Sequence, residues 1–219
     1  LLPGPGKLVD VGCGSGAFLA SCGQHLPDWQ LVGLEQAAKY EGKIRSLPGV
    51  VDFQPVPLDE LKGEYRLMTM IHVLEHIPAP SKNIAALNRQ MEPDGVFFIQ
   101  VPSWEENPFE LVVVDHASHF SGRQLLRVMK AAGSQAKYEV LTWLPKELSL
   151  VSSKCAEPDR EVPSAKEIED TEACVRSHLH WLEMVSLEAR KYMSRKPFAV
   201  FGTSIAANWL LGAIGSEAV

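Results

Sequence analysis

The stretch KLVDVGCGSG, which runs from Lys7 to Gly16, decides the fold class of this 219-residue chain. A short apolar run with an acid at its centre leads directly into three glycines at alternate positions. A glycine at the end of a parallel strand lets the backbone approach a ligand closely, and the helix that follows points its first amide groups at that ligand. The stretch therefore predicts a buried strand, a ligand-binding turn and a helix.

The alternation of strand and helix continues outward from this stretch through the first two thirds of the chain. Helical patterns lie between further apolar runs of strand length, which are WQLVGLE (29–35), VVDFQPV (50–56), YRLMTMIHVL (65–74) and GVFFIQVP (95–102). Strands that alternate with helices are typical of βαβ units, whose strands run parallel. We therefore expect an α/β fold with a Rossmann-like, doubly wound and mostly parallel sheet.

The last third of the chain has a different character. Residues 103–121 lack clean periodicity, and two closing strands are expected within 136–145 and 147–154. We divide the chain into a main domain at 1–154, a linker at 155–165 and a C-terminal part at 166–219. The C-terminal part is expected to hold one long helix and an extra βα unit. Because one βα unit cannot bury both of its faces, we expect the chain to be truncated there or the unit to pack on a neighbour.

Composition and charge exclude several classes of function. Hydrophobic residues make up 46% of the chain and charged residues 22%, and no apolar run approaches the roughly 20 residues that cross a bilayer. A net charge of −6 without a basic cluster argues against a nucleic-acid partner. Four cysteines without a CxxC pair indicate a reducing compartment, hence the cytoplasm, and no zinc site. We expect a small-molecule substrate and no membrane partner, while the oligomeric state stays open.

The residues around the glycines narrow the choice of cofactor. Enzymes that bind dinucleotides usually space their glycines as GxGxxG, whereas Gly12, Gly14 and Gly16 form GxGxG. Glu35 ends the second predicted strand, where a carboxylate can accept hydrogen bonds from two ribose hydroxyl groups. Both a dinucleotide and S-adenosylmethionine offer such hydroxyls. Asp10 is expected to hold the glycine turn or to face a cationic end of the ligand.

Three motifs together resemble the class I S-adenosylmethionine-dependent methyltransferases. VDVGCGSGAFL resembles their first motif, GLEQ resembles their ribose-binding acidic position, and HVLEHIPAP followed by MEPDGVFFIQVPS resembles the LEH signature and fifth strand of a small-molecule branch. The resemblance implies seven strands with the seventh antiparallel, a catalytic domain at 1–154, and S-adenosylmethionine rather than NAD as cofactor. The cofactor contacts that it implies are Asp10, Gly12, Cys13, Gly14, Gly16, Glu35, Gln36, Met70, Ile71 and His72.

One position departs from the family. Members often carry an acid just beyond the third strand that contacts the adenine amino group, whereas this chain reads QPVPLDE, with Pro55 and Val56 at that place. Asp59 or backbone amides are the alternatives for this contact. Cys13 lies inside the glycine turn, where a small side chain fits, and we expect it to pack rather than to react.

The candidate catalytic residues are histidines. VVVDHASHFSG resembles a segment of sugar C-methyltransferases in which the histidine at the position of His116 is linked to general-base chemistry, although Val113 and Val114 replace that segment's tyrosine and first histidine. An acceptor hydroxyl or acidic carbon must lose a proton, and an imidazole titrates in the range that suits this role. We predict His116 as the base, supported by His119 or His76. The alternative is that these histidines only stabilise loops over the substrate.

Several functional alternatives remain open at the level of sequence. The acceptor is expected to be a small molecule, with a sugar or nucleotide sugar as one class, and an O- or N-methyltransferase that works mostly by proximity is the nearest alternative. A non-catalytic methyltransferase-like binding module and an NAD-dependent oxidoreductase are the others. His178 and His180 are two residues apart on a predicted helix, therefore on different faces, and we expect no metal site.

Overall fold

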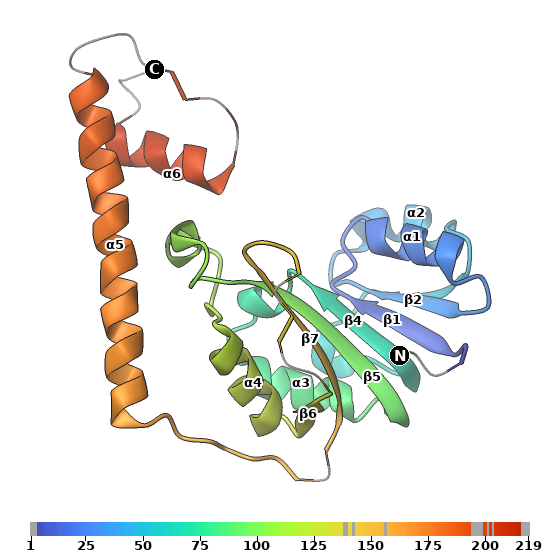
Figure 1. Ribbon diagram of the computed structural model, residues 1–219. Coiled ribbons are helices and arrows are strands. Elements are labelled where there is room, and N and C mark those ends of the chain that lie inside the picture. Colours follow the sequence, from blue (N-terminus) through green and yellow to red (C-terminus); the bar gives the residue numbers. More distant parts are fainter. Residues whose placement is uncertain are drawn as a thin grey trace.

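Within the described residues, seven strands form one sheet in the order β3-β2-β1-β4-β5-β7-β6 (Figure 1). The computed structural model describes residues 4–137, 140–141, 143–155, 157–193, 199–200, 202 and 204–215. The strands are β1 (Lys7–Val11), β2 (Gln30–Leu34), β3 (Val50–Gln54), β4 (Tyr65–Ile71), β5 (Met91–Pro102), β6 (Ser134–Ala136) and β7 (Glu147–Lys154). Neighbours among the first five pair in parallel, and β7 is antiparallel to β5 and β6. The predicted doubly wound, mostly parallel sheet with an antiparallel seventh strand is therefore confirmed.

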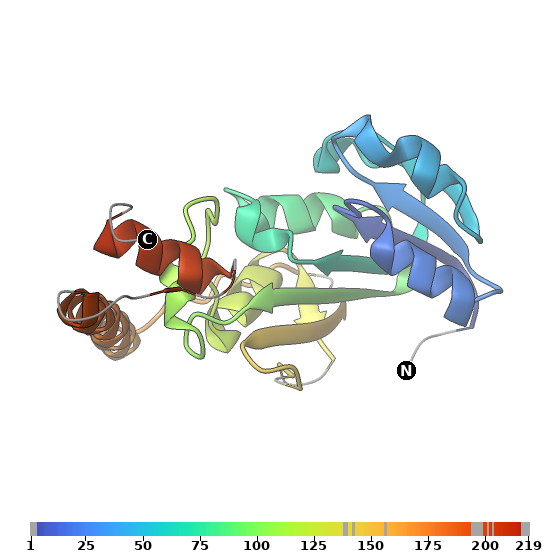
Figure 2. The same cartoon turned by 90° about the horizontal axis from the view of Figure 1, so that it is seen from above.

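Helices cover both faces of this sheet because side chains alternate along each buried strand. Val9 and Val11 of β1 belong to the core on one face, which also includes side chains of α3 (Pro80–Asn88) and α4 (Gly122–Ala131). Leu8 packs on the opposite face with side chains of two further helices. These are α1 (Ala17–His25) and α2 (Glu41–Arg45). Figure 2 gives the view from above.

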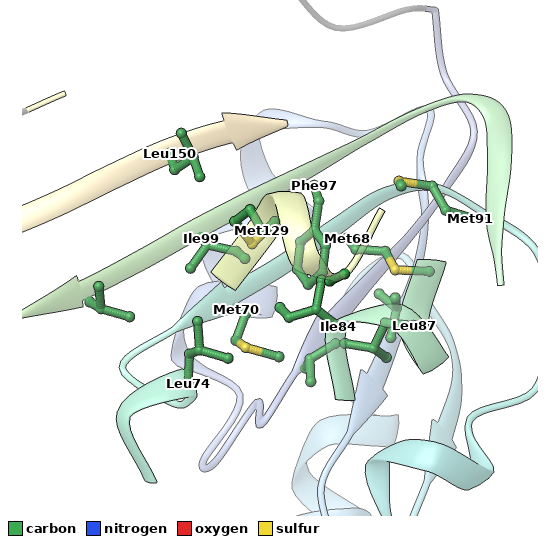
Figure 3. Close-up of a cluster of buried hydrophobic side chains, with 14 of the residues drawn as sticks. Met68, Met70, Leu74, Ile84, Leu87, Met91, Phe97, Ile99, Met129 and Leu150 are labelled. Carbon is green, nitrogen blue, oxygen red and sulfur yellow. The ribbon is translucent and has the colours of Figure 1, made fainter. Parts of the chain in front are cut away.

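The larger core lies between the centre of the sheet, α3 and α4 (Figure 3). Met68 and Met70 of β4 meet Phe97 and Ile99 of β5, and all four are fully buried. The other labelled residues of this cluster are Leu74, Ile84, Leu87, Met91, Met129 and Leu150. Burying one such side chain contributes about 1.5–3 kcal/mol to folding. This core holds the carboxyl ends of β1 and β4 in fixed register.

A capping box begins α4 and anchors the irregular segment in front of it. The Ser121 hydroxyl accepts from the Gln124 amide, and the Gln124 side chain accepts from the Ser121 amide. Such reciprocal bonds satisfy two amides that a helix start would leave unpaired. The indole Nε1 of Trp104 also donates to Gln124 Oε1, at 2.9 Å. Both ends of residues 103–121 are therefore tied to the start of α4.

The structure corrects three predicted boundaries. β5 begins at Met91 rather than Gly95, because a register shift between Tyr65 and Leu67 of β4 lets the turn-like PDG run continue the strand. The helical pattern of QAAKYEGKIRSL (36–47) predicts one helix, whereas the structure has a 3-10 turn η1 (Ala38–Tyr40) followed by the short α2. The strand expected at 136–145 is reduced to β6 plus an isolated bridge between Leu141 and Ser149. Residues 138, 139 and 142 lie outside the described part.

The C-terminal part is built around α5 (Ala165–Met193), the predicted long helix, which runs beside the domain in Figure 1. It contacts α6 (Ile205–Ile214) and the 3-10 segment η4 (Pro108–Val112). Phe109 meets the rings of Trp181 and Trp209 edge-on, each at 5.6 Å between centroids. Most of the strand predicted before α6 lies outside the described residues. No described helix combines the length and the apolar character that membrane crossing requires.

Candidate active site

The turn after β1 adopts left-handed backbone angles at all three glycines. Gly12, Gly14 and Gly16 have φ of 71°, 50° and 79°, which side-chain-bearing residues rarely adopt. A Cβ on Gly12 would lie 2.5 Å from Cγ2 of Val73, so a side chain there would collide with the loop after β4. A Cβ on Gly14 would meet open space. The turn is therefore closed on the protein side and open on the ligand side.

Glu35 stands directly beside this turn because β1 and β2 are neighbours in parallel register. Val11 pairs with Leu34, which brings the residue after β2 level with Gly12. The Gly14 amide donates to Oε2 of Glu35 at 3.1 Å, and the Ala37 amide donates to Oε1 at 3.2 Å. A carboxylate has about four acceptor positions, so two stay open for hydroxyl groups of a ligand. The predicted acidic position is thereby oriented by backbone amides.

A pocket of about 530 Å³ opens at the carboxyl ends of β1, β2 and β4. Its residues are Val11, Gly12, Leu34, Glu35, Gln36, Val56, Pro57, Leu58, Asp59, His72, Val73, His76, Ile77, Pro78 and Asn83. Glu35 and Gln36 offer polar groups, Val56 to Leu58 offer apolar contact, and Asp59 adds a carboxylate. These groups fit a nucleoside, with a carboxylate that can accept from ribose hydroxyls, an apolar wall for a flat base and a second carboxylate that can accept from an exocyclic amine.

Asp10 lies beneath the turn rather than among the residues that line the pocket. It is 4% exposed, and Oγ1 of Thr69 donates to its Oδ1 at 2.8 Å. Burial raises the pKa of Asp10 to about 7, against the opposing effect of the Thr69 hydrogen bond. Its hydrogen bond joins β1 to β4 just before the glycine turn, and Asp10 does not line the pocket.

Cys13 is buried within the smaller core beneath the turn. A Cβ on Gly33 would lie 2.9 Å from its Sγ, so the thiol fills the space that this glycine leaves. Burial, followed by the charges of Asp10 and Glu35, raises the pKa of Cys13 to about 12. The side chain is a thiol that packs, in line with the sequence-based interpretation.

The three residues predicted at the end of β4 separate in space. Met70 is fully buried in the core on the α3 face, and neither it nor Ile71 lines the pocket. His72 does line the pocket, with φ of 54°. A left-handed non-glycine residue is uncommon and is found often at functional sites. Of this group, His72 has the position of a ligand contact.

Three carboxylates that sequence reasoning missed as partners surround His72 and the other histidines. Glu75 and Glu110 are each 1% exposed, and Glu147 of β7 is largely buried. His72 Nδ1 lies 3.5 Å from Glu75 Oε1, and His72 Nε2 lies 3.5 Å from Glu147 Oε2. The contact with Glu75 raises the pKa of His72 despite partial burial, with further contributions from the charges of Glu147, Glu75 and Glu110. Burial is the main cause that raises the pKa of Glu147.

The structure brings the three predicted catalytic histidines together. His116 Nδ1 is hydrogen-bonded to Oε1 of Glu110, which also lies 3.7 Å from His119 Nδ1. The His76 ring meets the His116 ring edge-on, with centroids 4.7 Å apart. The Ser118 amide donates to the carbonyl oxygen of Glu75 at 3.0 Å, which holds the segment against the loop after β4. We call Glu75, His76, Glu110, His116 and His119 the histidine cluster.

The histidine cluster adjoins the pocket through His76, which lines the pocket and contacts His116. The glycine turn and Glu35 therefore form one end of the site, and the histidine cluster forms the other. Glu110 is the key addition to the predicted set. Its sequence signal was an acid placed in an apolar run, PFELVVV, where an exposed charge is not expected.

Comparison with known families identifies the main domain. Residues 1–137 match the family described as Methyltransferase domain. Trans-aconitate 2-methyltransferase of Deinococcus radiodurans is 30% identical over 115 residues, which cover 52% of this chain and 41% of that protein. Ubiquinone biosynthesis O-methyltransferase of Bordetella bronchiseptica is 30% identical over 117 residues, which cover 49% of this chain and 47% of that protein. The chain thus spans about half the length of the curated relatives it matches.

Solved structures share the fold at low sequence identity. Mitomycin 7-O-methyltransferase MmcR superposes with a TM-score of 0.61 at 16% identity, over 69% of this chain and 50% of that one. Human N-acetylserotonin methyltransferase, in a complex with SAM, gives a TM-score of 0.59 at 14% identity, over 68% of this chain and 48% of that one. At these low identities, the structural similarity shows a shared fold and nothing further.

Proposed function

This chain belongs to the class I S-adenosylmethionine-dependent methyltransferases, and we propose that it transfers a methyl group from S-adenosylmethionine to a small-molecule acceptor. The observation that carries the proposal is the contact between Glu35 and the Gly14 amide at the rim of the pocket. It joins an acid suited to ribose with an open, left-handed turn suited to close approach of a ligand.

S-Adenosylmethionine supplies an electrophilic methyl group on a sulfonium, and the residues of the pocket fit this cofactor. We assign the ribose hydroxyls to Glu35 and the adenine ring to the wall formed by Val56, Pro57 and Leu58. Asp59 lines the same wall, which supports it as the substitute for the acid that the family often has after the third strand. The glycine turn and His72 are assigned to the methionine side of the cofactor.

We assign the acceptor to the end of the pocket that adjoins the histidine cluster. Methyl transfer is an in-line displacement, so most of the rate is expected from holding the acceptor atom close to the methyl carbon and aligned with it. The acceptor must also lose a proton, and we propose His116 as the residue at which this occurs. Glu110 occupies its Nδ1 and leaves Nε2 for the proton. His119 and His76 support this arrangement.

The acceptor class is a hydroxyl-bearing small molecule in this proposal. The segment around His116 favours a sugar or nucleotide sugar, whereas the relatives carry the names trans-aconitate 2-methyltransferase and ubiquinone biosynthesis O-methyltransferase. Buried carboxylates and imidazoles can accept several hydrogen bonds from hydroxyl groups. An acceptor panel should therefore begin with nucleotide sugars and continue with carboxylic acids and phenols.

Calorimetric titration with S-adenosylmethionine, S-adenosylhomocysteine and NAD tests the proposal. We expect both sulfur ligands to bind and NAD not to bind, with a loss of about 10-fold or more for Glu35→Ala, because charge-assisted hydrogen bonds are lost. Glu64→Ala is the control, since Glu64 is exposed and does not line the pocket. A folded protein that prefers NAD, or binds neither sulfur ligand, contradicts the proposal. Cofactor binding without turnover on any acceptor favours a non-catalytic binding module.

A further inference from the structure

We propose that Glu75, His76 and His116 form a binding site for a divalent transition-metal cation at the acceptor end of the pocket. One potential ligand atom from each of the three lies within 4.8 Å of the other two. Two imidazoles and one carboxylate suit cations such as Zn²⁺, Fe²⁺ and Co²⁺. The location at the acceptor rests on the proposed function, whereas cation binding itself can be measured without it.

The ring orientations of both histidines favour metal binding. His76 Nδ1 donates to the carbonyl oxygen of Asp115 at 3.1 Å, and His116 Nδ1 donates to the carboxylate of Glu110. A histidine that binds a metal usually gives its other ring N–H to a carbonyl or carboxylate, which sets the tautomer and the ring angle. Each ring therefore has Nε2 as the nitrogen with a lone pair for a cation.

The third ligand, Glu75, has a buried oxygen that needs a partner. Glu75 is 1% exposed, and its Oε2 has no hydrogen-bond partner among the residues that the structure describes. A buried carboxylate oxygen without a partner is costly, by about 1–3 kcal/mol or more. The other oxygen, Oε1, lies 3.5 Å from His72 Nδ1. A cation at Oε2 would complete the coordination of this carboxylate.

The charge balance of the region points to a cation as well. Glu75, Glu110 and Glu147 come together there, and in the described part of the chain every recorded ion-pair partner of these three carboxylates is a histidine. Buried carboxylates are paired with cations or coordinate metals in most proteins, since neutral imidazole does not cancel their charge. A divalent cation supplies two positive charges at this place.

A second, overlapping set does not explain these observations as well. Glu110, His116 and His119 also offer ligand atoms within 4.8 Å of one another. However, Oε1 of Glu110 and Nδ1 of His116 are already hydrogen-bonded to each other, so neither of these two atoms is free for a cation. We therefore assign Glu110 to the support of His116, and Glu75 and His76 to the cation.

The site changes the chemistry assigned to His116. A divalent cation lowers the pKa of a hydroxyl group that it binds, so an acceptor there would lose its proton to solvent water without a free imidazole. His76 lines the pocket and is partly exposed, which gives a cation and an acceptor access from solvent. With a cation bound, His116 Nε2 serves as a ligand and the cation activates the acceptor; in the cation-free protein, the same Nε2 is the free base of the proposed function.

Titration of the metal-stripped protein with Co²⁺, followed by visible absorption, tests the site. Ligation by nitrogen and oxygen gives d–d bands that aqueous Co²⁺ lacks at this intensity, and we expect saturation at one Co²⁺ per chain. Glu75→Gln and His76→Ala should each weaken binding at least 10-fold, and Glu110→Gln should weaken it by about 10–100-fold through the orientation of His116. His180→Ala, on the exposed side of α5, is the control and should bind as the wild type does.

Thermal unfolding and cofactor calorimetry on the same samples make the outcomes distinct. Co²⁺ should raise the melting temperature of the wild type and not that of Glu75→Gln, which removes a buried charge and should fold. Absence of saturable Co²⁺ binding, or equal binding by Glu75→Gln and His76→Ala, overturns the cation site. If S-adenosylmethionine still binds in that case, the proposed function stands with His116 as the free base; if it does not bind, the proposed function fails as well.

Discussion

The two ends of the pocket are built in different ways. At the cofactor end, the β1 turn and Glu35 after β2 are joined by hydrogen bonds from backbone amides, and the loop after β3 adds the adenine wall. The acceptor end is assembled from the loop after β4, the segment around η4 and the start of β7, and it depends on side-chain contacts. Binding of a shared cofactor needs only the first, whereas the choice of acceptor lies in the second.

The variant His116→Ala gives the strongest test of the difference between the cofactor end and the acceptor end of the pocket. If the acceptor end carries the proton chemistry and the cofactor end does not depend on it, turnover should fall about 10²–10⁴-fold while the affinity for S-adenosylmethionine stays unchanged. Steady-state kinetics together with calorimetry measure the two quantities. His180→Ala is the control, because His180 is exposed on α5. Turnover within a few-fold of the wild type would mean that His116 only stabilises its loop.

Asp10→Asn tests the layer beneath the cofactor end. The pKa of Asp10 is about 7 in the folded protein and about 3.9 in an unfolded chain. Because the folded pKa is the higher one, the stabilising contribution of protonated Asp10 is complete below pH 4 and is lost as the pH rises through 7. The wild type should therefore lose up to about 4 kcal/mol relative to Asp10→Asn between pH 4 and pH 8.

Urea unfolding at several pH values measures this difference. Thr69→Val is a useful companion variant, because it removes the hydroxyl that donates to Asp10 and should raise the pKa of Asp10 further. Parallel stability curves for the wild type and Asp10→Asn over that range would show that Asp10 does not titrate as described.

Gly12→Ala tests whether the backbone of the turn, rather than any side chain, makes the cofactor end. The new Cβ would sit 2.5 Å from Val73 in a left-handed conformation, which costs about 1–2 kcal/mol from the backbone alone. We expect cofactor affinity to fall about 10-fold and the melting temperature to fall with it.

Gly42→Ala is the matched control for this variant. Gly42 lies within α2, and a Cβ there would meet no atom within 4 Å, so alanine should stabilise the helix by up to about 1 kcal/mol. Equal cofactor binding by both variants would refute the importance of the turn geometry.

Ser121→Ala has the smallest expected effect. It tests whether a change near the acceptor end alters acceptor binding without altering cofactor binding. Loss of the cap of α4 should cost about 1 kcal/mol and loosen the segment that carries His116, which should raise KM for the acceptor more than the Kd of the cofactor. Ser164→Ala removes a similar cap in front of α5, through its bonds with Glu167, away from the pocket. If both variants change KM equally, the capping box of α4 has no special link to the acceptor end.

The fold was largely predictable because its signals are local. Strand–helix alternation and the glycine spacing report directly on β1 to β5, and each glycine of the turn has the positive φ that its residue type allows. The strand boundaries that differ from the prediction are those that depend on pairing between strands. The bulge between β4 and β5 carries the PDG run into a strand, although turn chemistry alone favours a turn.

The candidate site was predictable at one end and only partly at the other. Glu35 is found where the strand-end rule puts it, since parallel register alone brings it to Gly12. Met70 and Ile71 were grouped with His72 by adjacency in sequence, but alternation along β4 turns Met70 into the core. His116 was predicted from the family resemblance together with the chemistry of imidazole, whereas Glu110 and Glu147 were not predicted as partners of the histidines.

By itself, the sequence determined the parallel sheet, the glycine turn and the acid beside it. Strand–helix alternation, the glycine spacing and the position of Glu35 at a strand end are all local patterns in the chain. Only the tertiary structure decided which acids meet which histidines. Glu75, Glu110 and Glu147 lie far apart in the chain. They converge because the Ser118 amide ties the segment after η4 to the loop after β4, and because β7 pairs antiparallel with β5. Contacts between distant segments depend on the packed fold, and no local pattern in the chain encodes them.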